Sequence, residues 1–252
     1  MAGVTEFSGD VVVLRVGTFR EADCWVRFFS PQHGLLTGFA FGGRKSRRRF
    51  CGCLDPFSVV HFRVGLDRLR RYHCLEEGTL LRGFPGLKRN IKNLGMMANC
   101  VRFFESQLFD PEEYAPSYAL LVETLEALEN GPAPSSFLPL LFRARLTFCQ
   151  GYQPDFERCR GCGQGMDPHH RAVFAVHEGG IYCLRCASSA VRTLSISQAT
   201  LRLLGALGQS NPAEWARWNL PAHVREECAR VVDAFVHYHL GLRSEGHGFY
   251  RC

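Results

Sequence analysis

Residues 10–43 read DVVVLRVGTFREADCWVRFFSPQHGLLTGFAFGG. Three runs in this stretch are rich in Val, Leu, Phe and Trp, and each ends at Gly, Pro or a charged turn. Such residues favour extended backbone, and such punctuation is typical of strands joined by short turns. Two further runs follow, FSVVHFRVG at 57–65 and LRRYHCLEEG at 69–78. The first eighty residues are therefore predicted to form five strands.

Five short strands in a segment of this length favour a small closed barrel, because closure removes unpaired strand edges. The leading prediction for residues 1–80 is the five-stranded oligonucleotide-binding (OB) barrel. An SH3-like barrel is the alternative, and strand pattern alone separates the two poorly.

Beyond the GFPG turn at 83–86 the apolar residues follow the period of a helix. Five helices are predicted, at 87–109, 116–131, about 135–151, 195–208 and 221–242. The fold class is thus α+β, with a helical domain at 81–150 and 191–252. A compact insert at 151–190 interrupts the helices.

Positive charge is concentrated near the start of the chain. The whole chain has a net charge of +6, and residues 1–72 hold 12 Lys and Arg against 6 Asp and Glu. Five of these cations fall in the segment GFAFGGRKSRRRF at 38–50: Arg44, Lys45, Arg47, Arg48 and Arg49. This basic segment predicts a polyanionic partner. A merely solvated basic loop is the alternative.

The same segment superficially resembles a nucleotide phosphate loop. In that loop the lysine follows the second glycine directly and a helix follows the lysine. Here Arg44 separates Gly43 from Lys45, and Gly52 and Pro56 leave no room for a helix. The segment is therefore predicted to grip phosphates of a nucleic-acid backbone, with Arg15, Arg20, Arg70 and Arg71 extending the track. Phe39, Phe41 and Phe50 could stack on bases, although alternating strand aromatics more often form core.

The insert carries two cysteine pairs, CRGC at 159–162 and CLRC at 183–186. This spacing predicts a four-thiolate zinc ribbon with Cys159, Cys162, Cys183 and Cys186 as ligands. Four thiolates close the coordination sphere, so the ion is expected to be structural. A redox pair and an iron–sulfur cluster are alternatives, and His169, His170 or His177 could replace a ligand.

No pattern typical of an enzyme is present. The chain lacks a G-x-S-x-G elbow, an H-E-x-x-H helix and a strand-linked G-x-G-x-x-G. It has no recognisable signal peptide and no apolar stretch long enough to span a bilayer. We therefore expect a cytoplasmic protein with reduced cysteines, no membrane contact and no catalytic residues.

Three parts of the chain resemble one known family. They are residues 9–57 with the GRKS patch at 43–46, GYQPDFERCRGCG at 151–163, and FVHYHLGLRS at 235–244. In this order they are similar to the RecO family of bacterial recombination mediators. The resemblance implies a protein of DNA repair that binds single- and double-stranded DNA and anneals complementary strands. It also implies cooperation with RecR in loading the recombinase RecA onto DNA coated by single-stranded DNA-binding protein.

The resemblance further suggests a contact with the acidic tail of the single-stranded DNA-binding protein, for which Lys88, Arg89 and Lys92 are candidates. A solvated helix face is the alternative for these three residues. A competing function is a zinc-ribbon transcription or scaffold protein without a direct DNA role. Salt-sensitive affinity for single strands would separate the two functions.

Overall fold

The structure is a computed structural model that describes residues 6–131, 136–166, 170–187, 193–215, 217–245 and 248–251. The chain forms two compact units. The first contains Met1–Met97 and Leu108–Asn130, and the second contains Ala98–Gln107 and Gly131–Cys252.

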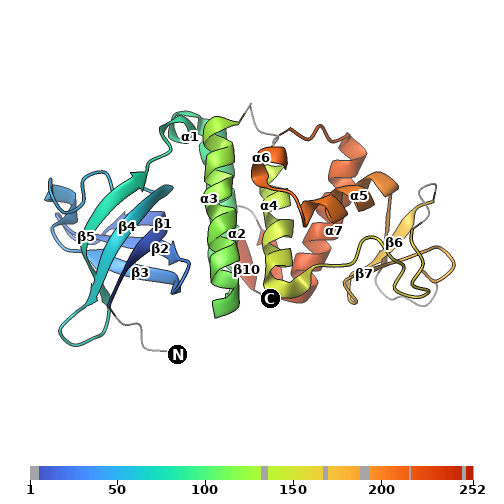
Figure 1. The fold of residues 1–252 in the computed structure, drawn as a ribbon, viewed down its shortest axis with the longest axis horizontal. Coiled ribbons are helices and arrows are strands. Elements are labelled where there is room, and N and C mark those ends of the chain that lie inside the picture. Colours follow the sequence, from blue (N-terminus) through green and yellow to red (C-terminus); the bar gives the residue numbers. More distant parts are fainter. Residues whose placement is uncertain are drawn as a thin grey trace. The chain divides into compact units, whose positions relative to one another are not determined.

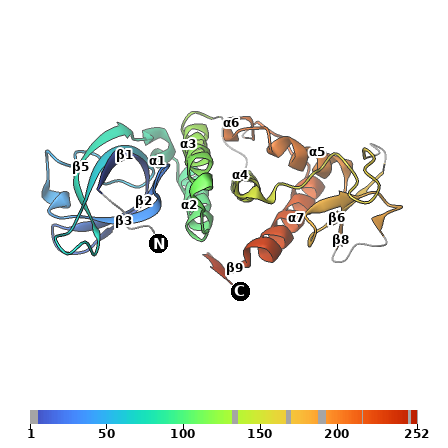
Figure 2. The ribbon, with the colours of Figure 1, turned by 60° about the horizontal axis from the view of Figure 1, so that its bottom comes forward.

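The first unit is built on a closed barrel of five strands (Figures 1 and 2). The strands are β1 (Phe7–Thr18), β2 (Cys24–Ser30), β3 (Gly34–Ala40), β4 (Ser58–Leu66) and β5 (His73–Arg82). Their order around the barrel is β1-β2-β3-β5-β4. The parallel pairing of β3 with β5 closes the ring, and all other neighbours are antiparallel. This confirms the predicted OB-type barrel.

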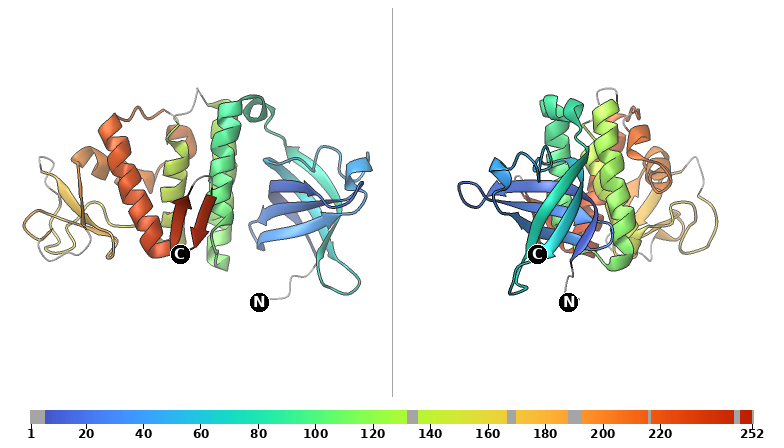
Figure 3. Two further views of the ribbon diagram at one scale, coloured as in Figure 1. Left: turned by 180° about the vertical axis from the view of Figure 1, so that it is seen from behind. Right: turned by 60° about the vertical axis from the view of Figure 1, so that its left-hand side comes forward.

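Strand β1 is buried on both faces over its central four residues. Val11 and Val13 point into the barrel core beside Phe28 and Phe62. Val12 and Leu14 alternate with them and are also buried. Helix α3 (Tyr114–Asn130) packs against β1 and β2 and covers part of the outer face (Figure 3). The apolar run VVVL is thus explained by a strand between a barrel interior and a helix.

The predicted helix at 87–109 is two helices, α1 (Pro85–Arg89) and α2 (Ile91–Glu105). Asn90 lies between them with φ −100° and ψ 106°, outside the helical region. Its side-chain oxygen accepts a hydrogen bond of 3.0 Å from the amide of Lys92 and so caps α2. The sequence predicted one helix because the apolar residues keep the same period on both sides of Asn90.

The second unit combines a small sheet with helices. Besides the part of α2 that follows Met97, its described helices are α4 (Leu138–Thr147), α5 (Gln198–Leu207), α6 (Pro212–Trp215) and α7 (Ala222–Leu240). A π-helical turn, η3 (Phe148–Tyr152), follows α4. Its three-stranded sheet has the order β7-β6-β8, with β6 (Ala172–Ala175), β7 (Gly180–Tyr182) and β8 (Thr193–Ile196). Helices α4, α5 and α7 pack against one another.

The end of the chain differs from the expected helix through 242. Helix α7 stops at Leu240, where Gly241 adopts a left-handed conformation with φ +61°. Strands β9 (Leu242–Glu245) and β10 (Gly248–Arg251) then pair as an antiparallel hairpin. Among the described residues, no helix has the length and apolar character needed to cross a membrane.

Candidate nucleic-acid interface and metal centre

The basic segment begins in the last residues of β3, and its five cations lie in the connection from β3 to β4, which is held against the barrel. It contains a short 3-10 turn, η1 (Gly43–Lys45), and residues 46–57, which lead to β4, contain no helix. The amide of Gly42 donates to Asp23 Oδ1 at 2.7 Å, and the amide of Gly78 donates to the Arg49 carbonyl at 2.7 Å. Phe50 is buried in the barrel core and anchors the end of the segment. The cations therefore stand on an ordered backbone.

All five cations of the basic segment are exposed. Lys45 Nζ lies 3.0 Å from Glu21 Oε1, with side-chain exposures of 66% and 90%. So exposed a pair contributes about 0–1 kcal/mol and leaves Lys45 available to a stronger anion. Within the described residues, Arg44, Arg47, Arg48 and Arg49 form no ion pair with a carboxylate. Four guanidinium charges thus have no compensating carboxylate among the residues that the structure describes.

Two of these arginines do make hydrogen bonds. Arg44 Nη1 donates to Thr18 Oγ1 at 3.4 Å, and Arg49 Nη2 donates to the Phe41 carbonyl at 2.6 Å. These neutral acceptors orient the guanidinium groups without cancelling their charge. Arg44 and Arg47 also line a groove that runs beside Gly17, Thr18 and Gly52.

The residues expected to extend the track are also at the surface. Arg15 is exposed on β1, and the Arg20 guanidinium lies 5.2 Å from the centre of the Phe19 ring. Arg70 is exposed, whereas Arg71 Nε is 3.2 Å from Asp67 Oδ2, which compensates its charge. Arg71 therefore contributes less net charge than its neighbours.

The three aromatic residues expected to stack on bases differ in their exposure to solvent. Phe50 is 3% exposed and belongs to the barrel core, so it cannot stack on a base. Phe39 and Phe41 lie on the outside of the barrel, and Phe41 is 37% exposed. Sequence reasoning missed Phe19 and Tyr72, which join them there, because no local pattern connects residues so far apart in the chain.

The three candidate residues for an acidic peptide also differ in availability. Lys88 Nζ binds Asp55 Oδ2 at 2.6 Å and Ser58 Oγ at 2.9 Å, and only 21% of its side chain is exposed. Arg89 and Lys92 are exposed, and neither side chain has a partner in the described part of the chain. Lys88 is thus a structural cation of the barrel–α1 junction, and two candidates remain.

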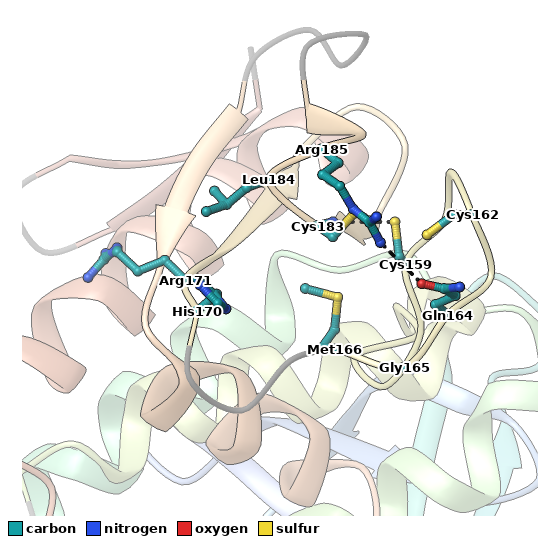
Figure 4. Close-up of a pocket in the computed structure, with 10 residues that line it drawn as sticks. All are labelled: Cys159, Cys162, Gln164, Gly165, Met166, His170, Arg171, Cys183, Leu184 and Arg185. Carbon is teal, nitrogen blue, oxygen red and sulfur yellow. Dashed lines mark hydrogen bonds between the residues drawn. The ribbon is translucent and has the colours of Figure 1, made fainter.

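The four cysteines of the insert gather into one cluster, which confirms the prediction from their spacing. Their sulfur atoms all lie within 4.8 Å of one another. Thiolates around one zinc ion would be about 3.8 Å apart, given a Zn–S distance of about 2.3 Å and tetrahedral geometry. The donor set and its spacing therefore fit a tetrahedral metal. Figure 4 shows the sulfurs of Cys159, Cys162 and Cys183 together, with His170 and Arg171 away from them.

The first cysteine turn is shaped by glycines. A Cβ at Gly161 would lie 2.9 Å from the Cβ of Cys186, and Gly163 has φ +70°. Burial alone would raise the pKa of Cys159, but backbone amides of Cys183, Cys162 and Gly161 lower it to about 6. Amides aimed at a sulfur stabilise the thiolate, which is the form that binds metal.

A line of aromatic rings joins the cysteine-bearing sheet to the helices of the same unit. Phe156 lies between Phe148, at 5.9 Å, and Phe174 of β6, at 6.2 Å. Phe174 in turn meets Phe235 of α7 at 5.8 Å. The third strand, β8, pairs with β6 and extends the sheet to residue 196, beyond the insert predicted at 151–190.

One surface arrangement has the connectivity of a catalytic triad. Ser8 Oγ is 2.9 Å from His61 Nε2, and His61 Nδ1 is 2.6 Å from Asp10 Oδ1. Strand register explains it, because Ser8 and Asp10 alternate on β1 and Asp10 pairs with His61 on β4. The His61 and Asp10 side chains are 45% and 53% exposed. Hydrolytic triads act beside preorganised oxyanion donors in a site that excludes water, unlike this open strand surface.

Comparison with known proteins gives consistent matches along the chain. The family described as "Recombination protein O N terminal" matches residues 1–84, and "Recombination protein O C terminal" matches residues 88–246. A DNA repair protein RecO of Maridesulfovibrio salexigens is 41% identical over 97% of this chain and 98% of its own length. The chain belongs to the RecO family of DNA repair proteins. The RecO proteins of Nitratidesulfovibrio vulgaris and Solidesulfovibrio magneticus are 44% and 42% identical, each over 98% of this chain, and 99% and 100% of their own lengths.

Family membership confirms the resemblance drawn from the barrel and cysteine segments. RecO similarity spans both the barrel and the cysteine cluster, so a role in DNA repair applies to the whole chain.

Proposed function

We propose that this RecO-family protein binds the backbone of single- and double-stranded DNA through the basic segment. The supporting observation is a set of four guanidinium groups that have no carboxylate partner in the described structure. Hydrogen bonds at Gly42 and at Arg49 fix the backbone that carries them. Phosphate contacts do not depend on base sequence, which suits a repair protein that meets any strand. They also leave base edges free, and annealing of complementary strands requires this.

A salt titration tests the proposal. Fluorescence anisotropy with a labelled oligonucleotide should give log affinity falling against log salt with a slope of about −4, if the five cations each meet a phosphate. Arg47→Ala/Arg48→Ala should reduce the magnitude of that slope by about 1.5. Arg225→Ala/Arg230→Ala, two exposed arginines of α7, is the matched control and should leave it unchanged. A wild-type slope near zero, or one untouched by the first pair, would refute the proposal.

The repair role is proposed to be that of a mediator. Bound to DNA coated by single-stranded DNA-binding protein, and together with RecR, the protein would help RecA to load. It would act in the cytoplasm on nucleoid DNA and would consume no nucleotide, because its contribution is binding and annealing.

For the cysteine cluster we propose one structural zinc ion held by Cys159, Cys162, Cys183 and Cys186. When bound, zinc would cross-link the two cysteine turns. Four thiolates fill its coordination sphere and leave no position for a reacting water. The chain itself prepares the site in two ways. Backbone amides stabilise the thiolate of Cys159, and Gly161 leaves room for Cys186 to approach the first cysteine turn.

Arg89 and Lys92 are proposed to receive the acidic tail of the single-stranded DNA-binding protein. Ile91 lies between them and is 78% exposed, so cations and an apolar contact occur together. Such a combination suits a peptide that ends in acidic and apolar residues. Arg89→Glu/Lys92→Glu should weaken binding of a labelled tail peptide at least tenfold, and Arg225→Glu/Arg230→Glu should not. If both variants bound the tail peptide equally well, the proposed site would be refuted.

A further inference from the structure

The groove beside the basic segment has the size of a ligand site. Its volume is about 740 Å³. Ligand pockets typically enclose roughly 300–1,000 Å³. Arg44 and Arg47 line the groove, and neither guanidinium group has a carboxylate partner among the described residues. Val16 and Leu54 line it as well, so the groove offers a ligand both positive charge and apolar contact.

Asp55 is the one acidic residue among those that line this groove. Its side chain is 56% exposed, and its Oδ2 atom accepts a hydrogen bond of 2.6 Å from Lys88 Nζ. Lys88 Nζ also donates to the hydroxyl of Ser58 at 2.9 Å, and Ser58 is fully buried. The ammonium group of Lys88 therefore holds the carboxylate of Asp55 in a fixed position beside the groove.

Pairing with Lys88 uses only one oxygen of Asp55. The other, Oδ1, accepts no hydrogen bond from the residues that the structure describes. A carboxylate beside two phosphate-binding arginines repels a polyanion, so contact with phosphates alone gives this oxygen no partner. A carboxylate oxygen only accepts hydrogen bonds, and Asp55 Oδ1 is therefore suited to a ligand group that donates one.

The ligand group can be identified from the chemistry of polynucleotide backbones. The backbone of DNA carries no hydrogen-bond donor between its two ends, because its phosphate and sugar oxygens only accept. The backbone of RNA carries one donor on every sugar, the 2′-hydroxyl. A strand whose phosphates meet Arg44 and Arg47 would bring the sugar between them into the groove, where Val16 and Leu54 can contact its carbon atoms.

We propose that the groove is a ribose site, in which Asp55 Oδ1 accepts a hydrogen bond from a 2′-hydroxyl of single-stranded RNA. Arg44 and Arg47 bind the phosphates on either side of that sugar. This inference rests on the proposed function, because the same cations hold the backbone, and it extends the ligand class from DNA to RNA. Contact through the sugar leaves the base edges free, so a bound RNA strand can still pair with a complementary strand.

The test uses three labelled oligouridine strands of equal length that differ only at the 2′ position, which carries hydrogen, hydroxyl or fluorine. The fluoro strand keeps a ribose-like sugar pucker but has no donor. In fluorescence anisotropy, the wild type should bind the ribo strand about tenfold more tightly than the other two, the effect of one hydrogen bond to a charged acceptor. Equally tight binding of the ribo and fluoro strands would show that sugar pucker decides, and would overturn the proposal.

Asp55→Asn removes the charged acceptor with little change in shape. Lys88 Nζ should keep the amide oxygen as its acceptor, which turns the NH2 group toward the groove and abolishes the preference for the ribo strand. Glu21→Gln is the matched control, because Glu21 is an exposed carboxylate that pairs with Lys45 at 3.0 Å and does not line the groove. Both variants lose one negative charge and should bind every strand somewhat more tightly, but Glu21→Gln should keep the preference.

The wild-type comparison decides the question even if Asp55→Asn does not fold. Equal affinity for the ribo and deoxy strands, with the salt dependence retained, would overturn the ribose site and leave the proposed function intact. A preference for the ribo strand that persists in Asp55→Asn would overturn the role of Asp55. Absence of salt-dependent binding to all three strands would instead refute the proposed function.

Discussion

The indole ring of Trp25 lies directly on the backbone of Gly17, its cross-strand partner in the barrel. A Cβ at position 17 would approach the ring to 2.3 Å, closer than any real contact allows. Trp25 is also the cross-strand partner of Phe39 on β3, so the same tryptophan links β1 and β3. Glycine is therefore required at position 17 for reasons of space.

Gly17→Ala is predicted to lower the free energy of unfolding of the barrel by about 2 kcal/mol, because the ring must move to admit a methyl group. Gly9→Ala on the same strand is the control, since its Cβ would meet its nearest neighbour at 3.8 Å. Urea unfolding of both variants measures the difference. In a Trp25→Leu background the cost at position 17 should shrink, and similar costs at positions 17 and 9 would contradict the steric explanation.

Asp67→Asn is predicted to weaken binding of single strands about fivefold by loosening the turn that carries Tyr72. The carboxylate of Asp67 accepts from the amide of Tyr72 at 3.1 Å and from Arg71 Nε at 3.2 Å. An asparagine keeps only one accepting oxygen, and its NH2 group would face a donor that now meets a carboxylate oxygen. Loss of a negative charge would by itself strengthen DNA binding, so the sign of the change is decisive.

Glu77→Gln is the control for Asp67→Asn, because Glu77 is an exposed carboxylate paired with Arg63. It should leave affinity unchanged or slightly raised in the same anisotropy assay. An increase in single-strand affinity for both variants would show that only charge matters at position 67.

The cysteine cluster predicts one metal ion per chain in protein purified without chelator. Cys183→Ser should lose the ion and unfold the second unit, because a bound structural zinc contributes about 10–16 kcal/mol in small zinc modules. The barrel has its own closed core, so it should keep its circular dichroism and its affinity for DNA. Cys51→Ser, at an exposed cysteine of the first unit, should keep the ion. Elemental analysis giving no metal in the wild type would refute the site.

Glu227 predicts how the second unit responds to acid. Burial would raise the pKa of this carboxyl, but donors at Ser197, Thr200 and Arg171 lower it to about 2 from an ordinary 4.5. A lowered folded pKa stabilises the fold fully above pH 4.5, and this stabilisation is lost as the pH falls toward 2. The loss amounts to about 3 kcal/mol in the free energy of unfolding.

Glu227→Gln should therefore be less stable at pH 7 and should show a flatter loss of stability between pH 4.5 and 2. Glu226→Gln, at the exposed neighbouring residue, should keep the wild-type slope. Denaturant unfolding across this pH range measures both variants. Parallel curves for Glu227→Gln and the wild type would show that the carboxylate does not control acid stability.

Local patterns predicted the elements well where a feature repeats over a few residues. The β-rich runs bounded by Gly, Pro or charged turns predicted the strands β1 to β5, and the two C-x2-C pairs predicted the cysteine cluster. Boundaries failed where one residue decides them, as at Asn90 between α1 and α2 and at Gly241 after α7. A capping residue changes the path of the backbone but not the spacing of the apolar residues. A prediction from that spacing therefore misses the helix boundary.

The candidate site was only partly predictable. The basic segment was visible as a run of charge, but the engagement of Lys88 by Asp55 and the burial of Phe50 were not. The sequence by itself determined a strand-rich amino-terminal part, a surplus of cations between 44 and 49, and a paired set of thiols. These depend on spacing within one segment, which covalent geometry controls.

Only the tertiary structure decided which cations keep their charge and which aromatic rings meet. Phe19, Phe39 and Tyr72 come together because β3 and β5 pair across more than thirty residues to close the barrel. Contacts of that kind depend on the register of the closed ring and on the packing of its core. Neither is encoded in the spacing of neighbouring residues.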